Sequence, residues 1–288
     1  MRPSVVILTY NSEKSLAETI RCSLTITDDV HVVDSFSSDS TTDIARQLGA
    51  RVTQRVFKTY GDQRNWAIDY LHLKYSWQLH LDADEQMSID LSEAIRTLPE
   101  NPPETGFFIA RLLNFMGRTL KHGGISPTWH MRLFRNGFGR CEQRQYDQHF
   151  YVREGATSYL PGVMIDYVCT TLSEWTVRHN RWADSEVDEQ SRCSKGEVGS
   201  RIQGRFFGTA IERKRSLRRL YDRAPLFFRP FALFFYRYIL RFGFLDGREG
   251  FIFWILQTFW FRFLVDAKIY EYRQRVAKST ALTTVCNQ

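Results

Sequence analysis

Short apolar runs alternate with stretches that read as helices along the first part of the chain. Four runs rich in β-branched or other apolar residues, at 4–9, 30–34, 51–54 and 77–81, are too short for helices and predict strands. The segments between them are predicted to form helices. Strands and helices in this alternation are typical of βαβ units, so the pattern predicts an α/β fold with a mostly parallel sheet and flanking helices.

Polar residues follow three of these strands at the point where each strand ends. They are Thr-Tyr-Asn at 9–11, the loop 34–41 that begins with an aspartate, and Asp-Ala-Asp-Glu at 82–85. Loops that follow parallel strands lie at one edge of the sheet, so we expect these three loops to meet. Such an edge frames a crevice of the kind that binds a nucleotide.

The carboxylates at 82–85 are candidates for a metal site. No glycine-rich phosphate-binding loop follows the first strand, and no G-x-x-x-x-G-K-[ST] occurs in the sequence, so a bound nucleotide needs another source of positive charge. Mg²⁺ and Mn²⁺ prefer oxygen ligands, and one or two carboxylates plus a phosphate hold them. We therefore predict a divalent cation at Asp82 and Asp84. The alternative is that these carboxylates only form a solvated loop.

Four segments, taken in order, carry a resemblance to a known family. They are VVILTYNS at 5–12, VVDSFSSDST at 32–41, GDQRNWA at 61–67 and LDADE at 81–85. Together they resemble family 2 glycosyltransferases of the GT-A fold, which is Rossmann-like, over about residues 3–190. Within that family the chain is most similar to the bacterial branch that includes the lipopolysaccharide inner-core glucosyltransferases.

The resemblance implies roles for individual residues. The nucleoside would be lined by Thr9, Tyr10, Asn11 and Asp34. Arg64 would lie beside the base or the diphosphate, Asp82 would face the ribose, and Asp84 would bind the metal. Two alternatives stay open, because Arg64 can be a solvated helix charge and Asp34 a helix-capping or turn acid.

The segment after residue 128 offers a diphosphate ligand and a base. Residues 129–135 alternate like a strand, and Arg132 suits phosphate oxygens, although it can equally be an ordinary edge-strand charge. Inverting sugar transfer needs one general base to take the proton of the acceptor hydroxyl. The sequence offers Asp147, which we favour, or His149. In the alternative interpretation both residues brace a loop.

The C-terminal third is basic and aromatic. Residues 201–288 contain 17 Lys and Arg against 6 Asp and Glu, and they account for the net charge of +7. Arginines interrupt the apolar segments 226–245 and 251–265, so neither is a convincing membrane span, and the pattern favours helices lying at an anionic membrane surface. The alternative is a buried helix that closes the core. Nucleic acid is not expected, because the aromatic residues form continuous apolar blocks.

Two regions and a location follow from these patterns. We expect a GT-A catalytic domain at 1–195 and a helical membrane-associating region at 196–288. Residues 171–190 are predicted to form an amphipathic helix, which the resemblance places under the acceptor site with His179, Asn180 and Trp182 as candidates. For Trp182, packing in the helix core is the favoured alternative. Five scattered cysteines without a C-x-x-C pair favour a reducing compartment, and the start of the chain predicts no signal peptide. The expected location is cytoplasmic, peripheral on the inner face of the membrane.

The predicted function is that of an inverting, metal-dependent glycosyltransferase. It would move a hexose from a nucleotide sugar, most simply a UDP-hexose, to a lipid-linked saccharide acceptor of cell-envelope polysaccharide or lipopolysaccharide. The first alternative is a nucleotidyltransferase that uses the same crevice, but its basic glycine-rich loop after the first strand is replaced here by Tyr10-Asn11-Ser12. The second is a membrane-recruited binding module without catalysis.

Overall fold

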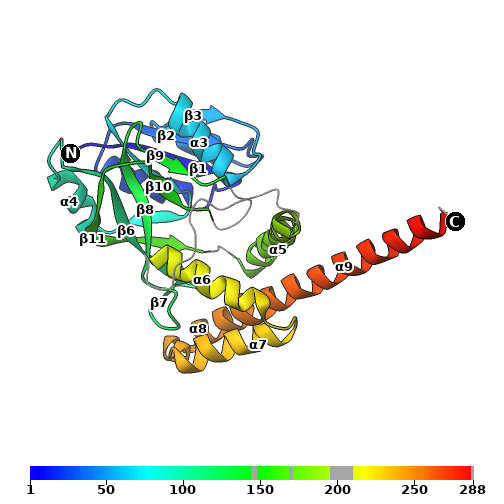
Figure 1. Cartoon of the computed structure of the whole chain (residues 1–288). Coiled ribbons are helices and arrows are strands. Elements are labelled where there is room, and N and C mark those ends of the chain that lie inside the picture. The colour runs from blue at the N-terminus through cyan, green and yellow to red at the C-terminus, as the bar shows by residue number, and fades with distance from the viewer. Residues whose placement is uncertain (144–147, 169–170, 195–209, 287–288) are drawn as a thin grey trace. The chain divides into compact units, whose positions relative to one another are not determined.

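The computed structural model divides the chain into two compact units, shown in Figure 1. It describes residues 1–143, 148–168, 171–194 and 210–286. The sheet unit contains Met1–Lys121 and Ile125–Thr170, and the helical unit contains His122–Gly124 and Thr171–Gln288. The predicted domain boundary after residue 195 falls outside the described ranges and stays a prediction.

The first part of the sheet unit has the predicted order of strands and helices. Its elements are β1 (Ser4–Thr9), α1 (Leu16–Leu24), β2 (Val30–Asp34), α2 (Thr41–Gln47), β3 (Arg51–Gln54), α3 (Tyr60–Tyr70) and β4 (Trp77–Asp82). The second part is mostly β-structure. Its elements are β5 (Glu85–Met87), α4 (Ile89–Thr97), β6 (Glu104–Phe115), β7 (Arg118–Leu120), β8 (Thr128–Arg135), β9 (Gly139–Cys141), β10 (Phe150–Val152) and β11 (Ala156–Tyr167).

One large sheet organises this unit. Its strand order is β3-β2-β1-β4-β8-β6-β11-β5, with β7 paired to β6. The first four strands are parallel, β8 is antiparallel to both of its neighbours, and β11 is parallel to β6. The sheet is therefore parallel over β1 to β4, the strands of the predicted βαβ units, and mixed over the remaining strands.

Side-chain alternation on β1 shows how the sheet is covered on both faces. Val5 and Ile7 pack into the main core together with buried residues of α1, α2 and α4. Val6 and Leu8 point to the opposite face, where they pack against Ala67 of α3. In Figure 1, α3 and α4 are seen flanking the strands. Because both faces are covered, β1 reads as a continuous apolar run.

The helical unit is built from helices and helical turns. Its elements are α5 (Leu172–Ser194), α6 (Ala210–Arg223), α7 (Phe228–Phe235), the π-helical turn η1 (Tyr236–Leu240), the 3₁₀ turn η2 (Gly243–Asp246), α8 (Gly247–Trp254), the π-helical stretch η3 (Ile255–Trp260) and α9 (Phe261–Cys286). The helix predicted at 171–190 is confirmed as α5. The chain reverses at Phe242, which adopts a left-handed backbone conformation with φ of 58°.

One helical stretch of this unit, Gly243–Lys278, is long and apolar enough to cross a membrane by length and composition. That test is weak, because the core helix of a soluble protein passes it as well. Several of its side chains are buried inside the unit, among them Phe253, Trp254 and Phe261. The residues that pack against these side chains distinguish a core helix of the unit from a helix that crosses a membrane.

Candidate active site

The ends of the first, second and fourth strands lie side by side. Thr9 at the end of β1 is aligned with Asp34 at the end of β2, and Leu8 is aligned with Asp82 at the end of β4. The amide of Ser35 donates to the carbonyl of Thr9 at 3.0 Å. The three loops predicted to meet at one edge of the sheet do so, which confirms that prediction.

Asn11 joins the loop after β1 to the loop after β2. Its amide donates to the hydroxyl of Ser37 at 2.8 Å, and its side-chain carbonyl accepts from the amide of Ser38 at 2.9 Å. Asn11 has a left-handed φ of 47°, a conformation that asparagine tolerates better than most residues. Next to it, Tyr10 is 54% exposed and Thr9 is buried. The contact of these residues with a nucleoside stays a prediction.

Asp34 is buried and fully hydrogen-bonded. Its carboxylate accepts from the amide of Ser37 at 2.9 Å, from the hydroxyl of Ser37, and from the side-chain amide of Gln54 at 3.0 Å. These bonds are those of a turn-forming acid, which was the alternative considered from the sequence. The structure therefore gives Asp34 a role in shaping the loop, and its nucleoside contact stays a prediction.

A buried charge network lies at the end of β4. Asp82 accepts from the guanidinium of Arg64 on one oxygen and from Arg132 on the other, the latter at 3.0 Å. Arg132 also donates to Glu85 at 2.6 Å, and Glu85 accepts from the amide of Asp82 at 2.8 Å. Arg64 is only 4% exposed, so it is not the solvated helix charge of the alternative reading. Arg64, Asp82 and Arg132, which come from distant segments and were proposed as donor-binding residues, therefore belong to one network.

Burial and the two arginines set opposite pKa shifts in this network. Burial alone raises the pKa of Asp82, but the positive charges of Arg64 and Arg132 outweigh it and hold that pKa well below its usual range. Burial raises the pKa of Glu85 to about 7, although Arg132 favours its ionised form. Asp82 therefore loses its proton at a lower pH than Glu85 does.

A small hairpin, β9 with β10, is attached to α3 beside this network. Asn65 binds Cys141 in both directions, since its side chain donates to the carbonyl at 2.8 Å and accepts from the amide at 2.9 Å. The guanidinium of Arg64 lies 5.2 Å from the ring centre of Phe150 on β10. The loop between β9 and β10 therefore starts and ends close to Arg64.

That loop carries the candidate general bases. Asp147 lies outside the described residues, so its position is not tested. His149 is buried, and its Nδ1 lies 3.5 Å from the carboxylate of Glu142. The backbone amides of these two residues also bind across the loop, with Glu142 donating to the carbonyl of His149 at 3.0 Å. Glu142 was not among the residues that the sequence analysis singled out.

A match to a protein family decides how this edge is interpreted. The sequence model described as glycosyl transferase family 2 matches residues 4–157, which is just over half of the chain. The chain belongs to glycosyl transferase family 2. Membership fits the α/β sheet with flanking helices and the three converging loops, and the fold is of the GT-A class with an added C-terminal helical region.

Curated relatives of this family 2 protein are glycosyltransferases of uncharacterised specificity. One from Rickettsia typhi is 38% identical over 92 residues, which is 32% of this chain and 31% of the relative. One from Rickettsia conorii is 39% identical over 92 residues, covering 32% of each. The match thus spans about a third of the length of these relatives, so their full activities do not transfer.

Two solved structures resemble the chain at a low level. TarS residues 1–349 from S. aureus is 15% identical with a TM-score of 0.43, covering 95% of this chain and 92% of that chain. Glucosyl-3-phosphoglycerate synthase from Mycobacterium tuberculosis, in complex with Mg²⁺ and UDP, is 19% identical with a TM-score of 0.31, covering 39% and 44%.

The residues of this family 2 chain fit a cation that is shared with a ligand. Within the described ranges, no three His, Cys, Asp or Glu side chains are grouped so that they could hold a metal ion alone. Both oxygens of Asp82 are bound by arginines, and Asp84 is a partly exposed residue two positions further on. Mg²⁺ sites in proteins often use one or two carboxylates plus substrate phosphates and water. Asp84 is suited to that arrangement.

The acceptor candidates on α5 belong to the helical unit. His179 is buried, with its Nε2 3.0 Å from Oε1 of Gln257 and its Nδ1 2.9 Å from the carbonyl oxygen of Trp175. Its ring also packs edge-on against Trp182 at 4.6 Å. The prediction that His179 faces an acceptor is therefore wrong, because it is part of the internal packing. Asn180 is exposed.

Proposed function

We propose that this family 2 glycosyltransferase is an inverting, metal-dependent enzyme that transfers a hexose from a UDP-linked sugar. The observation that carries the proposal is the meeting of the loops after β1, β2 and β4 at one edge, beside the Arg64–Asp82–Arg132 network. Ligands of open α/β sheets bind at such an edge. The donor would lie over these loops, with Tyr10 and Asn11 at the nucleoside.

The network would hold the donor through charge and geometry. Arg64 and Arg132 fix the carboxylate of Asp82 in one position and keep it ionised, so it can accept hydrogen bonds from a ribose hydroxyl. Asp84 would hold a divalent cation together with the diphosphate. When bound, the cation supplies neutralisation of the negative charge that builds on the leaving diphosphate. The nearby guanidinium groups add positive potential at the same place.

Transfer itself needs one base at the acceptor. The acceptor oxygen forms a bond to the anomeric carbon as the bond from that carbon to the diphosphate oxygen breaks, which inverts the configuration. The proton of the acceptor hydroxyl passes to a base, for which we propose Asp147 first and His149 second. The burial of His149 beside Glu142 supports a positioning role for that histidine.

We further propose that the acceptor is a lipid-linked saccharide of cell-envelope polysaccharide or lipopolysaccharide. The protein would then work at the cytoplasmic face of the membrane, as a peripheral protein. The basic excess of residues 201–288 supports this, because each Lys or Arg near an anionic leaflet contributes about 1 kcal/mol of attraction.

Titration calorimetry with UDP, with and without Mn²⁺, tests the donor site. We expect UDP to bind at least tenfold more tightly with Mn²⁺, and Asp84→Ala to lose this difference because its carboxylate holds the cation. The matched control is Asp90→Ala, an exposed acid in the first turn of α4, which should bind like the wild type. Undiminished dependence on Mn²⁺ in Asp84→Ala would remove the metal role.

The base is tested by separating turnover from donor affinity. A panel of UDP-sugars first identifies the donor by its hydrolysis. Asp147→Asn should then lower turnover at least a hundredfold with little change in donor affinity, since a general base contributes about 10²–10⁴ in rate. If His149→Gln shows that loss and Asp147→Asn does not, the histidine is the base.

A further inference from the structure

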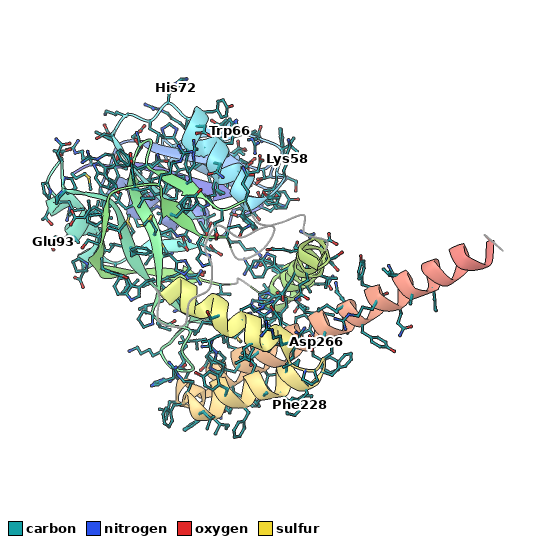
Figure 2. The ribbon with its side chains drawn as sticks, viewed as in Figure 1. Lys58, Trp66, His72, Glu93, Phe228 and Asp266 are labelled. Atoms are coloured by element: carbon teal, nitrogen blue, oxygen red, sulfur yellow. The ribbon has the colours of Figure 1, made fainter. Side chains whose placement is uncertain are left out.

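The hairpin of the helical unit exposes large apolar side chains. Between Phe228 and Phe263, eleven such side chains are more than a third exposed. Phe228 is the most exposed of them at 67%, and Figure 2 labels it on α7. Scattered exposed apolar residues are ordinary on protein surfaces, but a contiguous group of this size marks an interaction site.

These side chains form one face that spans both arms of the hairpin. On α7 and η1 they recur at three- or four-residue steps, at 228, 231, 235, 239 and 242. The returning arm adds Phe251 and Phe263. The two arms meet through the ring pair Phe231–Phe259 at 4.6 Å and the pair Tyr238–Phe251 at 5.6 Å. We call this surface the aromatic face.

Several charged side chains of the same segment point into the unit. Arg229 is 3% exposed, and it donates through Nε to Asp266 at 2.8 Å. Arg262 binds Glu186 of α5 at 2.9 Å. Figure 2 labels Asp266, which lies among the helices. This hairpin therefore exposes large apolar side chains, while Arg229, Arg262 and Asp266 are paired inside the unit.

A second group of charges is bound inside the unit at the turn of the hairpin. Asp246 accepts from the amide of His122 at 3.0 Å and from its ring at 2.8 Å. Arg237 donates to the carbonyls of Gly123 and Gly124, at 2.8 and 2.7 Å. The exposed guanidinium groups that remain at the turn are those of Arg241 and Arg248. They border the aromatic face and suit phosphate groups.

We infer that the aromatic face lies in the headgroup and upper acyl region of one leaflet of an anionic bilayer, with both arms parallel to the membrane plane. The outward aromatic residues would enter the acyl boundary, and Arg241 and Arg248 would meet lipid phosphates. This deepens the proposed function by naming the surface that holds the enzyme at the membrane, and it rests on the membrane location proposed there.

The internal ion pairs argue against a crossing of the bilayer. The arm at 228–240 is about 20 Å long at 1.5 Å per residue, which is shorter than a hydrocarbon core of about 30 Å. The stretch Gly243–Lys278 is long enough, but it carries Arg262 and Asp266 in ion pairs with α5 and α7. A crossing would take those partners into the hydrocarbon, where charge is costly.

Vesicle co-sedimentation of the full chain tests the inference. We expect binding to vesicles of phosphatidylcholine with phosphatidylglycerol, and at least tenfold weaker binding for Phe228→Ser/Phe231→Ser/Phe235→Ser. The control Tyr70→Ser/Ile89→Ser/Tyr159→Ser removes three comparably exposed apolar side chains from the sheet unit and should bind like the wild type. Wild-type binding by the phenylalanine variant, with an unchanged circular dichroism spectrum, would overturn the inference.

Two further measurements separate lipid from other occupants. Arg241→Gln/Arg248→Gln should lose most of the preference for phosphatidylglycerol. If the wild type instead forms dimers without lipid, and the phenylalanine variant abolishes the dimers but not vesicle binding, the face is an interface between two copies and the inference is wrong. UDP binding of the phenylalanine variant should be unchanged, so a failure of the donor site is seen separately.

The in-plane arrangement has its own test. Phe231→Trp places a fluorescent probe on the aromatic face. Lipids brominated near the headgroup should quench the added fluorescence more than lipids brominated near the chain ends. Stronger quenching by the deep bromines would show that the arms run through the hydrocarbon core, and would overturn the in-plane arrangement.

Discussion

The sheet unit and the helical unit treat their apolar residues in opposite ways. On β1, Val5 and Ile7 face one layer of helices and Val6 and Leu8 face another, so every apolar side chain has a protein neighbour. On the hairpin at 228–263, eleven large apolar side chains are more than a third exposed, while Arg229, Arg262 and Asp266 are paired inside the unit. The difference teaches that burial between packed layers accounts for the apolar pattern of β1, whereas the apolar pattern of the hairpin includes many exposed positions.

Both units contain buried ion pairs. Breaking one of them should cause the largest loss of unfolding free energy. Arg132→Met leaves Glu85 without its partner, and Arg229→Met leaves Asp266 without its partner. Each variant should lose about 3–5 kcal/mol of unfolding free energy, since breaking a buried pair strands a charge. Urea denaturation measures it. Arg140→Met, from a partly exposed pair with Asp69, is the control and should lose at most about 1 kcal/mol.

Two leucines, one from each unit, test whether apolar side chains are packed in the sheet and exposed on the hairpin. Leu81 on β4 is 0% exposed, and Leu240 at the end of η1 is 57% exposed. Leu81→Ala should cost about 2–5 kcal/mol, because it removes packed methyl groups and leaves a cavity. Leu240→Ala should change the unfolding free energy in water by less than about 0.5 kcal/mol. Similar losses of unfolding free energy in both variants would show that the hairpin surface is packed in solution, so that the two units would not differ in this respect.

Stability of the helical unit should depend on pH through His179. Burial lowers the pKa of this histidine from 6.5 to about 4, so the folded protein holds it neutral. The unfolded chain binds a proton below pH 6.5 and the folded chain does not, so the unfolding free energy should fall as the pH drops from about 6.5 to about 4. The loss is roughly 3 kcal/mol at most.

The control for that pH effect is His179→Gln, which can keep a hydrogen bond to Gln257 and cannot titrate. Thermal denaturation over this pH range should show a flatter profile for the variant. A profile with the wild-type slope would mean that another group is responsible.

Breaking an exposed ion pair should cause the smallest change in unfolding free energy. This change should be the same in both units. Arg46 pairs with Asp43 on α2, and Arg275 pairs with Glu271 on α9, and all four side chains are more than half exposed. Arg46→Ala and Arg275→Ala should each change the unfolding free energy by no more than about 0.5 kcal/mol. A loss above 1 kcal/mol in either one would point to an additional contact.

The sequence was sufficient to predict the parallel half of the sheet. Each of those strands is a short apolar run followed by a polar loop, and these local patterns determine both the strand and the edge at which its loop lies. The meeting of the loops after β1, β2 and β4 followed from topology alone, and the structure confirms it.

Pairings across long sequence distances could not be predicted. Arg132 lies 50 residues from Asp82, and no periodicity shows that β8 enters the sheet between β4 and β6 and turns this arginine toward that carboxylate. The burial of Glu85 depends on β5 joining the far edge of the sheet, beside β11. The internal position of His179 depends on Gln257 of a later helix. The individual roles of the predicted donor and metal residues stay predictions.

The outward orientation of the phenylalanines has a practical consequence for anyone who prepares this protein. A surface of this kind tends to self-associate in plain buffer, so extracts made without detergent or lipid would lose the enzyme to the pellet. Assays in such extracts would then underestimate transfer. Nanodiscs that contain acidic phospholipid are the setting in which turnover should first be sought.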